Sequence, residues 1–158
     1  MTEVIARLNR QATRKYYRES VIGILLADAL RAYADVDVGL IPAGAIRADL
    51  EAGELTHEEV LNVFPFTDKV SVITLSGSVL RQVIEKSLSL DYGLAQFSGL
   101  SLTYDSRRPI GNRLVEANVG PELLQDDRQY RLVTGSFTAT GGENYLMFEG
   151  LPMSTSEV

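Results

Sequence analysis

The sequence has no cysteine, only one histidine and no long hydrophobic run. Without cysteine the chain cannot form a disulfide, a thiol nucleophile or a cysteine-based zinc site. Its longest apolar run, Val21 to Ala27, has seven residues, whereas a membrane-spanning helix needs about 20. The N-terminal residues also lack a basic segment followed by an apolar one. We therefore expect no membrane span and no signal peptide, and the localisation stays unknown.

The length and composition favour a single globular domain. The chain has 158 residues, of which 45% are hydrophobic and 23% charged, so it can bury a core and does not belong to the disordered class. Its formal net charge is -6, and acidic and basic residues are interspersed. A protein that binds the nucleic-acid backbone normally carries a basic excess or a basic face. We therefore expect no nucleic-acid partner.

The hydrophobic pattern changes between helical and strand-like periods, which predicts an α+β fold with mixed sheets flanked by helices. Residues 1–15 are weakly patterned and are expected to be frayed or partly helical. The sequence Thr56 to Glu59 fits a capping box that starts a helix ending near Phe64. Further strands are predicted at 36–41, 70–75, 100–104, 114–119 and 130–133, and a further helix over 79–88.

The most apolar predicted element is a helix over residues 18–33. Its apolar positions recur on most sides, which is typical of a buried helix. We therefore expect Val21, Ile24 and Leu25 to belong to the core.

His57 is the only histidine, and it lies inside the predicted capping box, where an exposed surface role is expected. One histidine cannot supply the ligand set of a catalytic di-metal centre. It also has no cysteine and no evident serine partner for a nucleophilic site. We assign no catalytic residue and no metal site to this chain.

Residues 44–47 allow two interpretations, whereas two further features favour a structural one when taken alone. Gly44 to Arg47 follows a predicted strand and is either a tight turn or a place where Arg47 holds an anion or a hydroxyl-rich ligand. Phe66 and Phe137 each lie beside a break in regular structure, and core packing is the usual role of such a residue taken alone. The stretch Gly141 to Tyr145 is typical of a loop, because it lacks the spacing of a phosphate-binding loop.

A series of short stretches is spread in order over residues 18–150: Glu19-Ser20-x-x-Gly23, Ala27-Asp28-Ala29, Gly44-Ala45-Ile46-Arg47, Glu51-Ala52-Gly53-Glu54-Leu55-Thr56, Val63-Phe64-Pro65-Phe66, Leu75-Ser76-Gly77, Gln96-Phe97-Ser98-Gly99 and Phe137-Thr138-Ala139-Thr140-Gly141-Gly142-Glu143-Asn144-Tyr145. Together these stretches resemble the C-terminal domain of the 5′-nucleotidase family. On this basis we divide the chain into a lead-in (1–17), a 5′-nucleotidase C-terminal-like domain (18–152) and a tail (153–158).

In that family a separate N-terminal metallophosphatase domain carries two metals and a catalytic Asp–His pair, and the C-terminal domain supplies the nucleotide pocket. The resemblance implies that Phe66 and Phe137 sandwich a base. It also implies that Arg47 lies near the ribose and phosphates and that Gly93 lines the pocket. Glu143 stands where the family has an aspartate that binds ribose hydroxyls. No cofactor is implied within this chain, and family members are usually periplasmic or extracellular.

The sequence departs from the family pattern at several polar positions. Two asparagines of the first helix are replaced by Val21 and Ile24, and a third, before Arg47, by Pro42. A second family arginine is replaced by Tyr16, for which Arg14 or Arg18 could stand in, and the asparagine commonly two residues after the first phenylalanine is Asp68. The changes thin the sugar–phosphate end of the pocket and keep the base sandwich.

The resemblance therefore implies a domain that binds a purine nucleoside or nucleotide, with no catalysis of its own. Its partner would be a metallophosphatase domain in the parent protein. The alternative is an isolated or engineered scaffold or interaction domain that kept the fold and lost the pocket.

Overall fold

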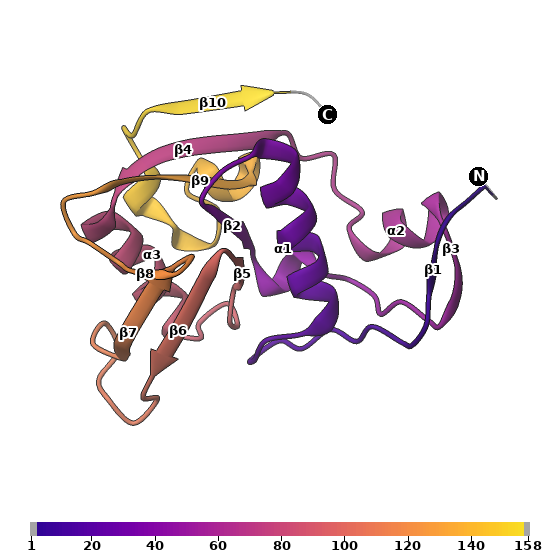
Figure 1. Cartoon of the computed structure of the whole chain (residues 1–158), viewed down its shortest axis with the longest axis horizontal. Coiled ribbons are helices and arrows are strands. Elements are labelled where there is room, and N and C mark those ends of the chain that lie inside the picture. Colours follow the sequence, from indigo (N-terminus) through magenta and orange to yellow (C-terminus); the bar gives the residue numbers. More distant parts are fainter. Residues whose placement is uncertain (1–2, 157–158) are drawn as a thin grey trace.

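The computed structural model describes residues 3–156 and is shown in Figure 1. Its strands are β1 (Val4–Leu8), β2 (Val38–Ile41), β3 (Gly53–Thr56), β4 (Val70–Ser76), β5 (Gln96–Ser98), β6 (Leu100–Tyr104), β7 (Leu114–Val119), β8 (Glu122–Leu123), β9 (Gln129–Gly135) and β10 (Met153–Ser156). Its α-helices are α1 (Val21–Ala34), α2 (His57–Val63), α3 (Gly77–Leu88) and α4 (Ser136–Ala139), and short 3₁₀ turns lie at Ala43–Ala45, Gly142–Asn144 and Leu146–Phe148.

The largest described sheet has five strands in the order β10-β4-β9-β2-β5. Strands β2 and β9 run parallel, whereas the other neighbouring pairs are antiparallel. Two smaller antiparallel sheets pair β1 with β3 and join β6, β7 and β8. This mixed sheet with flanking helices confirms the predicted α+β fold.

Helices α1 and α3 cover opposite faces of the five-stranded sheet. Leu40 and Ile41 are neighbours in β2 but belong to different clusters of buried apolar side chains. Leu40 shares its cluster with Leu80 and Ile84 of α3, and Ile41 shares its cluster with Ile22 of α1. Because successive strand residues point to opposite faces, the sheet has an apolar core on each side.

Helix α1 matches the predicted helix in position, but the prediction that it is buried on most sides is wrong. Ile22 is fully buried and Ile24 is half-buried, whereas Val21 and Leu25 are 49% and 44% exposed. The helix lies on one face of a sheet and therefore buries only one stripe of side chains. Val21 and Leu25 are four residues apart and share the stripe that faces away from the sheet.

The start of α1 joins two stretches that are far apart in the sequence. Ser20 caps the helix by accepting a hydrogen bond from the Gly23 backbone N–H at 3.1 Å. The buried side chain of Gln96 accepts from the Ser20 backbone N–H at 2.8 Å. A β-carbon at Gly23 would lie 2.3 Å from Cγ of Gln96, so only glycine allows this amide to lie against the helix.

Strands β1 and β10, at the two ends of the described chain, both join sheets. Residues 1–15 were expected to be frayed or partly helical, but Val4–Leu8 forms β1, which pairs with β3. Most side chains of β1 are exposed, so the strand is held by backbone pairing and leaves little hydrophobic signal.

The capping box at Thr56 is present as predicted. Within residues 3–156 no helix is long and apolar enough to cross a bilayer.

Candidate ligand-binding site

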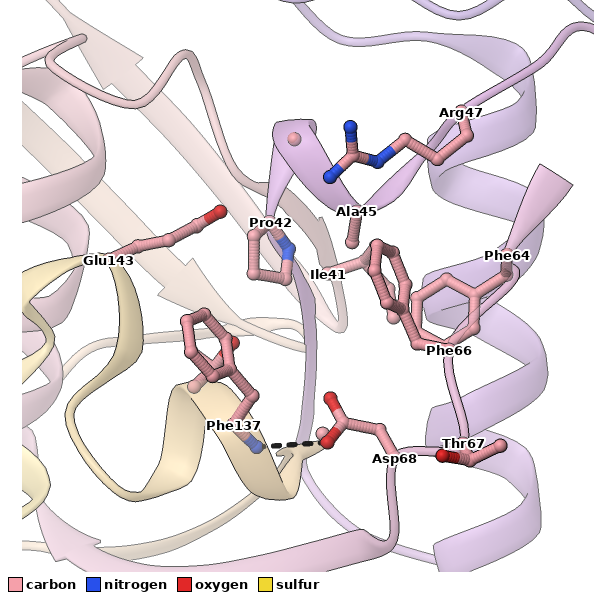
Figure 2. Close-up of a pocket in the computed structure, with 13 residues that line it drawn as sticks. Ile41, Pro42, Ala45, Arg47, Phe64, Phe66, Thr67, Asp68, Phe137 and Glu143 are labelled. Atoms are coloured by element: carbon pink, nitrogen blue, oxygen red, sulfur yellow. Dashed lines mark hydrogen bonds between the residues drawn. The ribbon is translucent and has the colours of Figure 1, made fainter.

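Three chain segments meet at one edge of the five-stranded sheet. Strands β4 and β9 are antiparallel with Val70 opposite Gly135, so the start of β4 lies beside the end of β9. Strand β2 is parallel to β9 and therefore ends at the same edge. This topology brings together the segments that follow β2, precede β4 and follow β9 (Figure 2).

The three segments enclose a cavity of about 400 Å³, a volume within the range of small-molecule sites. Four of the five predicted site residues line it: Arg47, Phe66, Phe137 and Glu143. Phe66 is 42% exposed and Phe137 is 61% exposed, so neither ring is packed in the core. In Figure 2 the two rings lie on either side of the open space. Phe66 and Phe137 therefore flank one cavity, and neither ring has the burial of a core residue.

Asp68 ties the two aromatic segments together. Its Oδ1 accepts hydrogen bonds from the Ser136 hydroxyl at 2.8 Å and from the Phe137 backbone N–H at 3.1 Å. The Ser136 backbone N–H in turn donates to the Lys69 carbonyl at 2.8 Å. Phe66 precedes Asp68 by two residues and Phe137 follows Ser136 by one, so these bonds fix both backbone segments that carry the rings.

Two glycines make room for this arrangement. A β-carbon at Gly135 would lie 2.4 Å from Oδ2 of Asp68, and one at Gly142 would lie 2.5 Å from the ring of Phe137. Any other residue at either position would displace the carboxylate or the ring. Gly142, in the stretch predicted to be a plain loop, therefore supports one wall of the cavity.

Arg47 lies across the cavity from Asp68 in Figure 2. Its backbone N–H donates to the Val63 carbonyl at 2.8 Å, and its guanidinium carbon is 5.2 Å from the centroid of the Phe66 ring. That distance allows a cation–π contact. Phe64 supports the same ring edge-on, with centroids 5.5 Å apart. Arg47 thus places a positive charge at the edge of the cavity, beside the ring of Phe66.

Glu143 approaches the cavity from the loop after α4. Its backbone has φ of 53°, a left-handed conformation uncommon for a residue other than glycine. Its carboxylate is close to the turn after β2, because a β-carbon at Gly44 would lie 3.2 Å from Oε1. Burial raises the pKa of Glu143, and the nearby charges of Lys86 and Arg47 oppose that shift. Glu143 can therefore accept a hydrogen bond in the part of the cavity that is nearer to Arg47 than to Asp68.

Gly93, the fifth predicted site residue, is not among the residues lining this cavity. It is buried, and a β-carbon there would lie 2.5 Å from the carbonyl oxygen of Tyr16 and 2.9 Å from Cβ of Ala43. That same carbonyl accepts from the Leu94 backbone N–H at 2.8 Å. Gly93 therefore packs between Tyr16 and Ala43 of the turn that follows β2.

The positions that depart from the family pattern are placed unevenly. Pro42 lines the cavity, whereas Val21 and Ile24 do not. Tyr16 lines a second hollow of about 390 Å³, on the other side of the Gly44 turn, together with Arg14, Lys15 and Arg47. Arg14 donates to the Arg47 carbonyl at 2.8 Å. Positive side chains therefore flank the turn on the side where the family arginine is missing.

Potential metal ligands are not clustered in the described part of the chain. Within residues 3–156 no group of three histidine or acidic side chains is placed to hold a metal ion. His57 is exposed at the first position of α2 and does not line the cavity. The residues present do not fit the di-metal centre of the family, so we assign no metal-dependent step to them.

The chain thus has an α+β fold with a cavity of small-molecule size at one edge of its largest sheet, and comparison with known proteins identifies the family. The family model for "5'-nucleotidase, C-terminal domain" matches residues 2–150. The chain belongs to this family, as the sequence motifs predicted.

Individual relatives agree with this assignment. An apyrase from Tabanus yao is 32% identical over 130 residues, which cover 73% of this chain and 24% of the apyrase. A 5'-nucleotidase from Vibrio parahaemolyticus is 29% identical, covering 82% of this chain and 23% of that protein. The crystal structure of a 5'-nucleotidase precursor from Thermus thermophilus superposes with a TM-score of 0.92 at 26% identity, over 99% of this chain and 34% of that one. The matched region thus spans about a quarter of the length of the two curated relatives.

Proposed function

We propose that this domain binds a purine nucleoside or nucleotide, with the base stacked between Phe66 and Phe137. The observation that carries the proposal is that both rings are exposed and line one cavity, which Arg47 and Glu143 also line. Buried phenylalanines would have indicated core packing instead. Aromatic faces bind bases by stacking, each contact contributing about 1–3 kcal/mol.

The charged residues give the ligand an orientation. Arg47 extends the cavity toward Arg14 and Lys15, so phosphate groups lie on that side, where guanidinium donors pair well with phosphate oxygens. Glu143 approaches the same turn and accepts hydrogen bonds from the ribose hydroxyls. The base then lies deeper, between the rings and above Asp68.

Within a complete protein, this domain would present the nucleotide to a metallophosphatase domain. Relatives named 5'-nucleotidase and apyrase are about four times as long as the matched region, which leaves room for such a domain. We assign no phosphate release to this chain alone, because its only histidine lies outside the cavity. Phosphate release from AMP or ATP with added manganese, zinc or cobalt, abolished by a chelator and retained through further purification, would contradict this assignment.

Isothermal titration of the chain with adenosine, guanosine and their 5'-monophosphates tests binding. We expect saturable binding and a melting temperature that rises with free ligand over Kd. The monophosphates should bind more tightly than the nucleosides, and Arg47→Ala should remove that difference while nucleoside binding remains. If neither purine binds at millimolar concentration, the scaffold alternative, which Pro42 at a usually polar position favours, is correct.

A further inference from the structure

The cavity contains one acceptor that the proposed function has not used. Asp68 lies between the two phenylalanines, and one of its carboxylate oxygens points into the open space (Figure 2). Among residues 3–156, both hydrogen bonds to this carboxylate end on Oδ1, from Ser136 and Phe137. Oδ2 lies against Gly135 and is the oxygen that points into the space between the two rings in Figure 2, where the edge of a stacked base would lie.

Oδ2 of an ionised Asp68 can accept hydrogen bonds but cannot donate one. A carboxylate has about four lone-pair sites and no donor, and two of those sites are taken on Oδ1. The sites on Oδ2 can only accept. A base edge that presents adjacent N–H groups satisfies them, whereas an edge that presents an acceptor puts two lone pairs against each other.

Purine bases differ in this respect. Guanine carries N1–H beside the 2-amino group, so two neighbouring donors can point at one carboxylate. Adenine presents its 6-amino group beside N1 or N7, both acceptors, which suits an amide that donates and accepts. This chain has an aspartate here, which cannot donate to either of those acceptors.

On these observations we propose that Asp68 is a specificity-determining residue that makes the site prefer guanine nucleosides and nucleotides over adenine ones. The inference rests on the proposed function, since it needs a base between Phe66 and Phe137. Asp68 keeps its place for a reason independent of ligand, because Oδ1 holds the Ser136 and Phe137 segment. The orientation of Oδ2 is thus fixed before a ligand binds.

The test is a titration series in which the base edge alone changes. Guanosine, inosine and adenosine are titrated into the unaltered chain by calorimetry. We expect guanosine to bind most tightly, inosine (which keeps N1–H and lacks the 2-amino group) next, and adenosine at least about tenfold more weakly than guanosine. 1-Methylguanosine, which lacks the N1 donor, should also lose about tenfold.

Asp68→Asn provides the matched variant. Its Oδ1 can still accept from Ser136 and Phe137, and its amide group then faces the cavity, so the ratio of guanosine to adenosine affinity should fall by about tenfold or invert. Asp127→Asn removes the same charge from an exposed turn and should leave the ratio unchanged. If Asp68→Asn does not fold, the 1-methylguanosine comparison decides alone.

The outcomes separate this inference from the proposed function. If the unaltered chain binds none of the nucleosides, the proposed function fails and the inference fails with it. If it binds adenosine as tightly as guanosine, or tolerates 1-methylguanosine, the base site stands and the role of Asp68 is refuted. An unchanged ratio in a folded Asp68→Asn also refutes it.

Discussion

Replacing Phe137 with alanine separates a ligand-binding ring from a structural one. The side chain is 61% exposed, so only about two fifths of its burial is at stake, which corresponds to roughly 0.6–1.2 kcal/mol of the approximately 1.5–3 kcal/mol for full burial. Phe148 is fully buried and stacks on Tyr145 with centroids 5.8 Å apart. Its replacement by alanine should cost about 3–5 kcal/mol. The stability loss of Phe148→Ala therefore serves as the reference for a buried ring, with which the loss of Phe137→Ala is compared.

Purine affinity, unlike stability, is expected to fall in Phe137→Ala. Loss of one stacking face should weaken purine binding by roughly five- to 150-fold, while Phe137→Ala remains folded. Tyr33 has the same exposed fraction of 61% but lies on α1 outside the cavity, so Tyr33→Ala should bind as the unaltered chain does. Urea denaturation gives the free energy of unfolding, and calorimetry gives Kd. A stability loss in Phe137→Ala equal to that in Phe148→Ala, or an unchanged Kd, would refute the reasoning.

Three further predictions concern stability. Val21→Asn should change the free energy of unfolding by no more than about 0.5 kcal/mol because the side chain is half exposed, whereas Ile22→Ala in the adjacent buried position should cost about 2–5 kcal/mol; equal effects in urea denaturation would contradict the orientation of α1. Thr56→Ala removes the capping box of α2 and should cost about 1 kcal/mol in the same assay. Burial raises the pKa of Glu143 above its ordinary 4.5, so its stabilising effect is present at low pH and is lost as pH rises through the raised pKa. Glu143→Gln should thus be more stable than the unaltered chain near neutral pH and equal to it below the ordinary pKa, and a difference independent of pH would contradict this.

Elements with a strong hydrophobic period were predictable from the sequence. The strands expected at 100–104 and 114–119 appear with those bounds as β6 and β7, and the capping-box helix begins at His57 as expected. Strand β1 was missed because most of its side chains are exposed and its stabilisation comes from backbone pairing. The burial of α1 was overestimated because apolar residues such as Val21 and Leu25 lie on its outer face.

The candidate site depended on pairing that no local pattern contains. Phe66 and Phe137 are each typical core residues when considered alone, and the antiparallel pairing of β4 with β9 is what brings their segments together. Only the resemblance to a family linked the two residues. The role of Asp68 as the bond between the segments follows from the structure, although its position two residues after Phe66 marked it as a departure.

The placement of the departures bears on whether the cavity is a relic. If the polar losses of the sequence had gathered around the cavity, the scaffold alternative would be favoured, because apolar replacements leave no polar group unsatisfied. Val21 and Ile24 do not line the cavity, so among the three asparagines replaced by an apolar residue or proline only the one at Pro42 does. On the phosphate side, Arg14 and Lys15 line the hollow that also contains Tyr16 and Arg47. Exposed apolar side chains occur elsewhere on the chain, for example Val21 and Leu25, so exposure of Phe66 and Phe137 is not decisive by itself. Their placement around one cavity that Arg47 and Glu143 also line is what favours a retained pocket over a relic.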